Sequence, residues 1–494
     1  MKRLNRLVVN MYKDGLHLRI PLISKRLAGL LQAELTYTHK KYLATWEERK
    51  QSHGAPVTLT DVECFERYKF EDVPQLVTLS GYLPRITQLL RRHNYAPRLT
   101  DLRPYPRQSV FEPSWRHLGR FELRPKQKEL LDAVVAELNG NGRGQIRYPT
   151  GAGKSFLAKL ICLLFPKAKI VVTTKHLDPL LDLFNGLSEV ATSVGLYCSR
   201  KKVSGKRIMC YSTGSLRRAL AEQPDLLMID ESHEVATDHI MGTLGEFRFC
   251  RMLGLSANHN DRFDGADFEL EGCLGPLIAD LDYADAVAAG LIVPIEVHWR
   301  NVRLSCNPCA DHNGVIKKRH GIWRNTARNR LIARDARLFP DDQVLITVQT
   351  LEHALHLQRQ LAEFSLCYST MKEEDRDGYI RKNLLPAGFQ PLSFEGRAQL
   401  KSQFETGKLR KVIATPVWKR GVNFHRLQVL IRADGGASDI DSTQIPGRLS
   451  RLCSVTGKRV GVLIDYLDQF DEKFEDAAKS RARCYKGKKW LQIL

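Results

Sequence analysis

The amino-acid sequence predicts an α/β fold in which two consecutive parallel-sheet domains follow a smaller α+β accessory domain. Three observations support this prediction. Residues 119–290 alternate short apolar strand patterns with longer helical patterns, and residues 291–470 show the same alternation. Such alternation is typical of parallel sheets covered by helices. The 494 residues suffice for roughly two to four domains of about 100–200 residues each. Residues 1–118 differ from both stretches in charge and pattern.

The first 118 residues are expected to form a basic, DNA-binding accessory domain. Residues 1–120 hold 21 Lys and Arg against 11 Asp and Glu. This surplus of 10 positive charges is about half of the net charge of +21. Leu7–Met11 and Leu16–Ile20 flank a Lys-Asp-Gly turn and predict a β-hairpin. Lys25–Leu35 and Leu83–His93 have helical apolar spacing. The stretch Pro97–Pro113, with its repeated prolines, predicts a linker.

The two larger domains are defined by their expected strands. In the first domain these are Ile170–Thr173, Arg207–Tyr211, Leu226–Ile229 and Met252–Leu255. In the second domain they are Gln343–Val348, Lys411–Ala414, Gln428–Ile431 and Val460–Ile464. Residues 471–494 are interpreted as a basic, helix-like tail.

Composition narrows the classes of function. The chain holds 76 Lys and Arg against 55 Asp and Glu, and such a surplus favours a polyanionic partner, above all nucleic acid. No apolar stretch is long enough to span a membrane, so a membrane partner is not expected. The 11 cysteines are scattered, which favours reduced thiols and a cytoplasmic location, in a bacterium or a phage-infected host, over a disulfide framework.

The strongest motif runs from Tyr148 to Ser155, with the sequence YPTGAGKS. It follows a short expected strand and opens an apolar helix, which is the context of a phosphate-binding loop. Its backbone N–H groups would face phosphates at a helix N-terminus. Lys154 would reach the β- and γ-phosphates, and Ser155 would ligate Mg²⁺. The strict pattern has glycine where Tyr148 stands. The residues expected to cradle the phosphates are Thr150, Gly151, Ala152, Gly153, Lys154 and Ser155.

Two adjacent carboxylates follow an apolar strand, 76 residues after Lys154, in the sequence LLMIDESH. Hydrolysis of Mg²⁺-ATP requires a metal-binding carboxylate and a group that activates water. We therefore assign Asp230 to Mg²⁺ and Glu231 to the attacking water.

A third motif, QIPGRLSR, spans Gln444 to Arg451 and matches the pattern Q-x-x-G-R-x-x-R. Arg448 and Arg451 are three residues apart and are expected on one helix face. The guanidinium fork suits them to bridge phosphate oxygens as charge develops.

These three motifs, in this order, resemble superfamily 2 helicases of the DEAH type, here with the spelling DESH. The resemblance covers about residues 119–470 and extends to weaker motifs. LRPKQ at 123–127 resembles the adenine-reading segment, with Arg124 and with Gln127 as the base contact. VTTK at 172–175 and STG at 212–214 resemble backbone-binding motifs, and they supply Thr174, Lys175 and Thr213 as nucleic-acid contacts.

Two further segments belong to the same resemblance. GLSAN at 254–258, with Arg262, Asp264 and Gly265, resembles the motif that couples hydrolysis to movement, although Asn258 replaces the usual Thr. Ala414-Thr415 with Gly421, Val422 and Asn423 resembles a motif that touches nucleic acid and ATP. From it come Thr415 as a nucleic-acid contact and Gly421 and Asn423 as ATP contacts.

The resemblance implies two tandem RecA-like motor domains that bind ATP and Mg²⁺ between them. Closure on ATP would bring Arg448 and Arg451, with Gln444, onto the phosphates. The compact core and basic N-terminal region look similar to UvsW-type phage recombination helicases and, more distantly, to RecG. The implied function is ATP-dependent unwinding or branch migration of DNA in recombination, repair or replication. Single-stranded and branched duplex DNA, and recombination or replication proteins, would be its partners.

Several alternatives remain open at this point. The track can be RNA, the chain can be the translocase subunit of a restriction-type complex, or it can be a P-loop kinase of small molecules. A non-enzymatic DNA-binding module would not need Lys154, Asp230 and Glu231 together. Cys306 and Cys309, with His312 and His320, are interpreted as free thiols in a turn rather than zinc ligands. Trp46, Trp115 and Lys486–Lys489 are weaker candidates for contact with nucleic acid.

Overall fold

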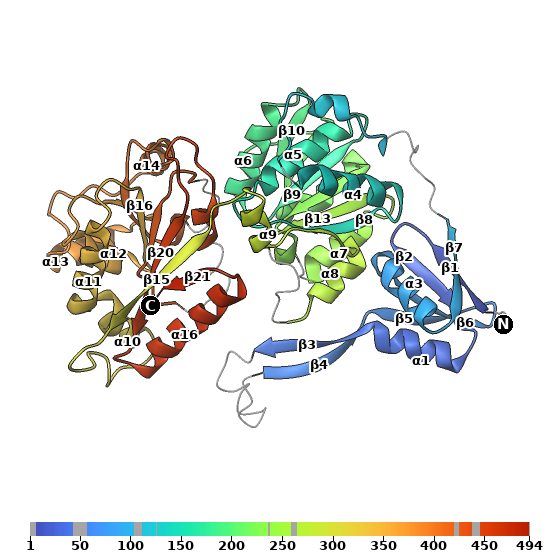
Figure 1. Cartoon of the computed structure of the whole chain (residues 1–494), viewed down its shortest axis with the longest axis horizontal. Helices are drawn as coiled ribbons and strands as arrows, with labels where there is room; N and C mark the ends of the chain where they lie inside the picture. Colours follow the sequence, from blue (N-terminus) through green and yellow to red (C-terminus); the bar gives the residue numbers. More distant parts are fainter. Residues whose placement is uncertain are drawn as a thin grey trace. The chain divides into compact units, whose positions relative to one another are not determined.

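The computed structural model describes residues 6–42, 57–102, 111–124, 126–235, 238–257, 264–418, 424–436 and 445–493. The chain divides into two compact units, residues 1–149 with 153–282 and residues 150–152 with 283–494. Figure 1 shows the elements of each unit. The division at residue 282 lies slightly before the predicted boundary at 290, because α9 (Tyr283–Ala288) belongs with the second unit. Tyr283 there accepts a hydrogen bond from the backbone N–H of Ile295 at 2.7 Å.

The N-terminal domain is a mixed sheet with two helices packed on one face. Its strands lie in the order β5 (Phe65–Phe70), β6 (Val73–Leu79), β2 (His17–Pro21), β1 (Leu7–Lys13) and β7 (Tyr95–Asp101). The predicted hairpin is confirmed, since β1 and β2 pair antiparallel. The helices α1 (Lys25–Glu34) and α3 (Leu83–Arg92) bury Leu27, Leu31 and Ile86 against the sheet. The side chain of Ser24 caps α1 by accepting from Leu27 N, as N-cap serines do.

The linker predicted at Pro97–Pro113 is wrong for its first part. Tyr95–Asp101 forms β7, which pairs parallel with β1 over seven residues. Pro97 is tolerated there because β7 lies at the edge of the sheet, where a missing N–H leaves no neighbouring strand unpaired. Residues 103–110 lie outside the described part of the chain.

The N-terminal domain is docked onto the first motor sheet. The buried Arg143 of β8 (Arg143–Arg147) donates to the carbonyl of Gly15 at 2.9 Å. A Cβ atom on Gly15 would lie 1.6 Å from the carbonyl oxygen of Arg248, so only glycine fits. Tyr82 donates to the carbonyl of Phe268 at 2.7 Å, and Arg85 forms a two-bond ion pair with Glu271 at 2.6 and 2.8 Å.

A two-stranded hairpin, β3 (Thr36–Tyr42) and β4 (Val57–Glu63), extends from this domain. Its base contacts α8 (Asp267–Leu274) and the residues just before that helix. Tyr37 donates to Glu269 at 2.6 Å, and the backbone N–H of Lys40 donates to the carbonyl of Asp264 at 3.1 Å. The hairpin therefore packs on Asp264 of the predicted coupling motif and on α8, which follows it.

The rest of the first unit is a parallel sheet of seven described strands. Their spatial order is β10 (Val194–Tyr197), β11 (Ile208–Ser212), β9 (Ile170–Thr174), β12 (Leu226–Asp230), β13 (Arg251–Ser256), β8 and β14 (Leu277–Asp280). Helix α4 (Gln127–Asn139) precedes β8, and the helices between the strands are α5 (Lys154–Leu164), α6 (Leu177–Ser188), α7 (Asp238–Glu246) and α8. All four predicted strands are confirmed to within a residue or so. Apolar side chains of β9, β11, β12 and β13, among them Val171, Leu227 and Met252, form the core.

The second unit repeats this architecture. Its described strands lie in the order β17 (Ser365–Cys367), β18 (Lys411–Ala414), β16 (Val344–Thr347), β19 (Val429–Arg432), β20 (Gly461–Asp468), β15 (Ile295–Val302) and β21 (Leu491–Ile493), all paired parallel. The helices are α10 (Gly314–Lys318), α11 (Thr326–Arg337), α12 (Leu351–Gln358), α13 (Glu373–Arg381), α14 (Phe394–Thr406) and α16 (Glu472–Gly487). The four predicted strands of this domain are again confirmed.

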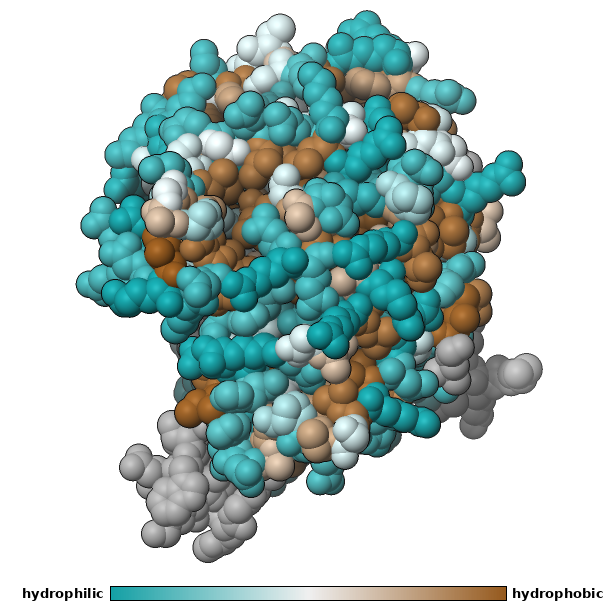
Figure 2. Space-filling model, turned by 90° about the vertical axis from the view of Figure 1, so that its left-hand side faces the viewer, coloured by the Kyte–Doolittle hydropathy of each residue, from teal (hydrophilic) through white to brown (hydrophobic). Residues whose placement is uncertain are grey.

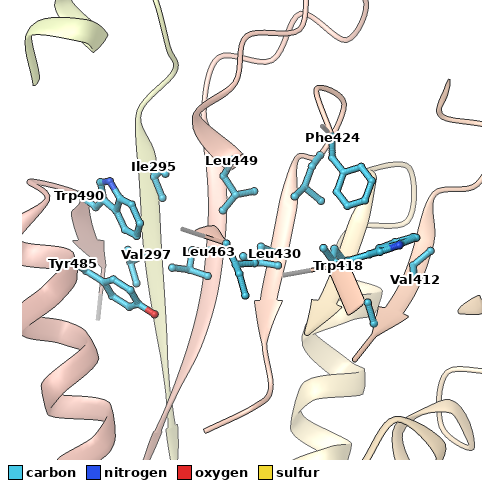
Figure 3. Packing of buried hydrophobic residues seen from close by; sticks show 14 of the residues in the cluster. Ile295, Val297, Val412, Trp418, Phe424, Leu430, Leu449, Leu463, Tyr485 and Trp490 are labelled. Atoms are coloured by element: carbon cyan, nitrogen blue, oxygen red, sulfur yellow. The ribbon is translucent and has the colours of Figure 1, made fainter. Parts of the chain in front are cut away.

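The segment 471–494, predicted as a basic, helix-like tail, is helical as α16, but it is not a tail, because it belongs to the core of the second domain. Helix α16 places Tyr485 in that core, and Trp490 follows it, beside Ile295 and Val297 of β15 (Figure 3). The fully buried Arg481 forms an ion pair with Asp465 at 2.9 Å. The segment is thus basic in composition, but its central charge is paired with a buried carboxylate of β20.

The remaining expectations concern the surface and the cysteines. Among the described residues, no helix has the length and apolarity needed to cross a membrane, and no three or more His, Cys, Asp and Glu side chains gather where they would hold a metal ion. Cys309 is buried and donates to Asn307, whereas His312 and His320 stack on each other. Figure 2 shows one face of the surface, on which hydrophilic and hydrophobic residues are interspersed.

Candidate active site

The phosphate loop connects the end of β8 to the start of α5. Gly151 and Gly153 have φ angles of 91° and 103°, which side-chain-bearing residues rarely adopt. Gly153 therefore precedes α5 in a conformation that leaves the first N–H groups of the helix facing the loop. The hydroxyl-bearing Ser155 in the first turn of α5 is exposed. The backbone at Tyr148 does not adopt a positive φ, so the glycine of the strict pattern is not required there.

The two predicted carboxylates stand at the carboxyl end of β12, next to that loop. Asp230 is the last residue of the strand, and Glu231 follows it in a left-handed conformation with φ of 53°. The Lys154 ammonium lies 2.5 Å from Glu231 Oε1 and 3.5 Å from Asp230 Oδ1. The structure thus brings together three residues that the sequence separates by 76 positions.

Burial and charge act against each other on these groups. Burial by itself would lower the pKa of Lys154, but the charges of Glu231 and Asp230 outweigh it and raise that pKa. Burial raises the pKa of Asp230, and Lys154 opposes this only in part. Burial also acts on Glu231, yet Lys154 and His233 hold its pKa below the usual value. Lys154 is therefore a cation, and Glu231 is the more readily ionised carboxylate.

The donor set fits a hydrated Mg²⁺ ion. Asp230 Oδ1 is buried and accepts no hydrogen bond from the described residues, and Ser155 offers a hydroxyl. Mg²⁺ commonly takes one or two protein oxygens and fills its other positions with phosphate and water. Asp230 and Ser155 are the residues present that could hold it.

Two contacts behind the carboxylates were not foreseen from the sequence. His233 Nδ1 lies 2.8 Å from Ser256 Oγ at the end of β13, and His176 Nε2 lies 2.8 Å from Glu234 Oε2. The first joins the DESH segment to the predicted coupling motif. The second joins it to the start of α6. The only signal in the sequence was the final His of DESH.

Gln127 begins α4 and is fully buried. Its Oε1 atom accepts a hydrogen bond from the backbone N–H of Arg124 at 2.9 Å. Its Nε2 atom completes no hydrogen bond with the described residues. Pro125, between them, lies outside the described residues. The predicted adenine-reading segment therefore presents a buried amide with an unused donor.

The candidate nucleic-acid contacts are placed unequally. Thr174 is buried at the end of β9, whereas the neighbouring Lys175 is exposed. Thr213 is buried, with its hydroxyl 3.4 Å from that of Thr173. Thr415 is buried after β18, and its N–H donates to the carbonyl of Cys367 at 2.9 Å. As placed, Lys175 offers the most accessible side chain of the four.

In the second unit the arginine motif adopts a different conformation from the one predicted. Pro446–Ser450 forms a short 3₁₀ turn, η8, and Arg451 follows it in extended backbone. The expectation that both arginines lie on one helix face is therefore wrong, because Arg451 lies beyond the end of η8. Arg448 is buried and donates to the carbonyl of Trp418 at 2.6 Å. Predicted residues outside the described part of the chain are Trp46, Asn258, Arg262, Gly421, Val422, Asn423 and Gln444.

Comparison with known proteins places this site in context. The family model described as Type III restriction enzyme, res subunit, matches residues 120–261. A relative named helicase 22, from a Sulfolobus islandicus filamentous virus (isolate Iceland/Hveragerdi), is 24% identical over 422 residues, which cover 77% of this chain and 69% of the relative.

Two solved structures are similar in fold. Dbp5 of S. cerevisiae, bound to RNA and ADP BeF3, has 12% identity and a TM-score of 0.51, covering 79% of this chain and 94% of its own. T4 UvsW covers 99% of both chains at 13% identity, but its TM-score of 0.41 is too low to establish a shared arrangement. Two tandem RecA-like sheets and the helicase relative agree with the motifs.

This chain resembles the superfamily 2 helicases.

The resemblance implies an enzyme that uses ATP and Mg²⁺. The second RecA-like sheet removes the support for a small-molecule kinase, which would not need it. The phosphate loop and the DESH carboxylates occupy the carboxyl ends of parallel strands, which is where open α/β sheets bind their ligands. The helicase relatives do not decide between DNA and RNA.

Proposed function

We propose that this chain is an ATP-dependent DNA helicase or translocase that unwinds or branch-migrates DNA at forks, junctions or recombination intermediates. The observation that carries the proposal is the meeting of Lys154 with Asp230 and Glu231 at the sheet edge beside a phosphate loop. This arrangement supports hydrolysis of a nucleoside triphosphate coupled to movement along a strand.

In this mechanism each residue of the first motor domain has one task. Lys154 leaves its carboxylate partners and neutralises the transferred phosphate. Glu231 orients the attacking water and accepts its proton, for which its lowered pKa keeps it ionised. Asp230 and Ser155 would hold Mg²⁺, which supplies charge neutralisation on the phosphates. The loop residues 150–153 cradle the phosphates through backbone N–H groups.

The second motor domain would contribute the charge that acts in the transition state. We assign Arg448 and Arg451 to the phosphates, supported by Gln444, and Gly421 and Asn423 to further contacts with ATP. Thr174, Lys175, Thr213 and Thr415 would grip the backbone of one strand. Contacts with the backbone of one strand do not distinguish branched from linear nucleic acid, so recognition of a branch requires another element.

The N-terminal domain is our candidate for that element. Its exposed basic side chains include Lys25 and Arg26 on α1, Arg91 and Arg92 on α3, and Arg98 on β7. Because the domain is docked on the first motor sheet, DNA bound to it would be held in a fixed relation to that sheet. We expect the cell's cytoplasm as its location, with recombination or replication proteins as partners.

Two other functions have specific support. Dbp5 is bound to RNA in its structure, which favours an RNA track. The family model carries the name of a restriction subunit, which favours a translocase within a restriction-type complex. Both alternatives keep the motor and change only its substrate or its partner.

ATP turnover measured with single-stranded DNA, forked DNA, linear duplex and RNA separates these functions. We expect the largest stimulation by forked DNA. Equal or larger stimulation by RNA would favour the RNA helicase, and stimulation by linear duplex alone would favour the restriction translocase. Turnover that no nucleic acid stimulates would contradict the proposal.

A variant with Gln at Arg26, Arg91 and Arg92 tests the branch-recognition role. For every phosphate that these side chains bind, the substitution should lower the slope of binding against salt by roughly 0.7–0.9, and the preference for forked over linear DNA should fall. The matched control makes the same change at Lys473, Lys479 and Arg483, which are exposed on α16. If both variants keep the same fork preference as the wild type, the N-terminal domain does not recognise branches through α1 and α3.

A further inference from the structure

Positive charge is concentrated a second time near the start of the second unit. Residues 300–337 hold 10 Lys and Arg against 2 Asp and Glu, a surplus of 8. Together with the surplus of 10 in residues 1–120, this accounts for most of the net charge of +21. None of the motifs assigned to ATP or to nucleic acid falls within residues 300–337, so those motifs do not explain this charge.

The structure separates these cations into two groups. Four of them are held by carboxylates of the same unit: Arg328 by Asp468 at 2.8 Å, Lys317 by Asp471 at 2.7 Å, and Arg319 and Arg324 by Glu352 at 3.1 and 2.5 Å. Arg328 is fully buried, and an unpaired charge there would be costly. These four cations are therefore explained by ion pairs within the second unit.

The second group forms a row on the outer face of α11. Arg330, Arg334 and Arg337 are exposed, and their spacing of four and three residues places them on one side of the helix. The other side packs Ile332 and Ala336 into the core of the sheet. The row is about 10 Å long, at about 1.5 Å per residue. It spans about three phosphates of one strand of a duplex, in which phosphates advance about 3.4 Å along the axis.

The row retains a net positive charge. Arg334 lies 3.5 Å from the buried Asp335, but its side chain is 68% exposed, and ion pairs so exposed contribute little. Asp335 also lies 3.6 Å from Arg300, so one carboxylate is divided between two arginines. Arg337 donates to the carbonyl of Gln360, which fixes the guanidinium without removing its charge.

We propose that Arg330, Arg334 and Arg337 bind the phosphate backbone of a nucleic-acid duplex, which gives the second motor domain a contact with the polyanion that is separate from its helicase motifs. The proposal rests on the proposed function, because it takes nucleic acid as the partner of the motor. It adds a binding surface and the form of nucleic acid that this surface binds.

Three properties of the helix favour a duplex backbone over other partners. Arginine suits phosphate, because its planar fork binds two phosphate oxygens at once. Helix α11 contains no aromatic residue, so it offers no platform for the unpaired bases of a single strand. A protein interface has an apolar centre that is poor in charge. Leu338, at the end of the row, is exposed and apolar, but one such side chain does not form that centre.

Binding of duplex and single-stranded DNA of equal length to the full chain, measured by fluorescence anisotropy without nucleotide at several salt concentrations, tests the proposal. The variant combines Arg330→Gln, Arg334→Gln and Arg337→Gln. Each lost phosphate contact should lower the slope of duplex binding against salt by roughly 0.9, so the three changes should lower it by about 2 to 3. The slope for single-stranded DNA, and ATP turnover at saturating single-stranded DNA, should keep their wild-type values, because no motif residue is changed.

Two further variants make the result specific. The control combines Lys473→Gln, Lys479→Gln and Arg483→Gln, which removes the same charge from exposed positions of α16 in the same unit, and it should keep the wild-type duplex slope. Because Arg337 also contacts the Gln360 carbonyl, a variant with only Arg330→Gln and Arg334→Gln preserves that contact. It should lower the duplex slope by about 1 to 2.

The outcomes are separable. Wild-type duplex slopes in both α11 variants would overturn the proposal and leave an acidic protein surface as the partner that the row fits. Equal losses in the α11 and α16 variants would also overturn it, since they would reflect overall charge rather than contacts on α11. An equal fall for single-stranded DNA would overturn the assignment to a duplex. Wild-type ATP turnover that no nucleic acid stimulates would instead reject the proposed function, whereas the binding slopes, which need no ATP, decide the α11 proposal.

Discussion

Replacement of Lys154 by alanine should destabilise the nucleotide-free protein more than replacement of its carboxylate partner. Lys154 lies 2.5 Å from Glu231 and 3.5 Å from Asp230, and the three side chains are 10%, 28% and 11% exposed. Without Lys154, two adjacent carboxylates remain in a buried site. Breaking a buried ion pair costs about 3–5 kcal/mol. Because Glu231 is partly exposed to water, we expect the lower end, about 3 kcal/mol.

Glu231→Gln has the opposite consequence for charge. It leaves the Lys154 ammonium beside Asp230, so one cation faces one anion, and the unfolding free energy should change by less than about 1 kcal/mol. Both variants should lose most ATP turnover, because each removes a group required for hydrolysis. Stability therefore distinguishes two variants that activity alone cannot separate.

The destabilisation in Lys154→Ala should depend on pH with a definite sign. Burial already raises the pKa of Asp230, and Lys154 opposes that rise. When Lys154 is absent, the folded-state pKa of Asp230 moves further above the unfolded value, and Glu231 loses the main charge that holds its pKa down. A carboxyl of this kind destabilises the fold when ionised, so stability falls as pH rises through these values and is regained toward pH 4.

Hydrogen exchange of peptides from α5 and β12, without nucleotide, provides the measurement. Lys154→Ala should exchange faster than wild type at pH 7, after correction for the intrinsic rate, and the difference should shrink at pH 5. Glu231→Gln should resemble the wild type. Equal protection in the two variants, or a destabilisation that does not change with pH, would refute this account of the site.

Three further predictions concern other parts of the molecule. Arg448→Ala and Arg451→Ala should lower kcat for ATP more than they raise KM, since we assign both to the transition state; a pure KM effect at either position contradicts that role. Removal of residues 471–494 should unfold the second domain, because Tyr485 and Trp490 belong to its core; a soluble product with native circular dichroism would contradict this. Arg85→Ala should weaken docking of the N-terminal domain by about 1–2 kcal/mol, seen as faster hydrogen exchange in α3 and α8 but not in α16.

The sheets were predictable because their strands are apolar and end in recognisable motifs. Leu226–Ile229 and Lys411–Ala414 are examples, since a run of buried β-branched and aliphatic residues is typical of a central parallel strand. The phosphate loop and the carboxylates could be predicted because their chemistry restricts which residues stand at which spacing. The roles of these residues in hydrolysis stay predictions.

The segments that the sequence predicted wrongly depend on contacts with residues that are distant in the sequence. Arg481 makes 471–494 look like an exposed basic helix, and only Asp465 in β20 explains its burial. Pro97 suggests a linker, and only the edge position of β7 makes it a strand. The docking of the N-terminal domain depends on Arg143 reaching Gly15, and no local pattern in either segment indicates that contact.

The fit at Gly15 has a consequence for how such proteins evolve and can be engineered. Any side chain there would collide with the Arg248 backbone, and a backbone cannot retreat as a side chain can. The N-terminal domain is therefore not an interchangeable module. Transplanting it onto another motor, or replacing it with a domain of different specificity, would require the recipient to reproduce the 248 loop and the Arg143 side chain. We expect the N-terminal domain and the first motor sheet to be inherited together, so chimaeras should be joined at the boundary near residue 282 instead.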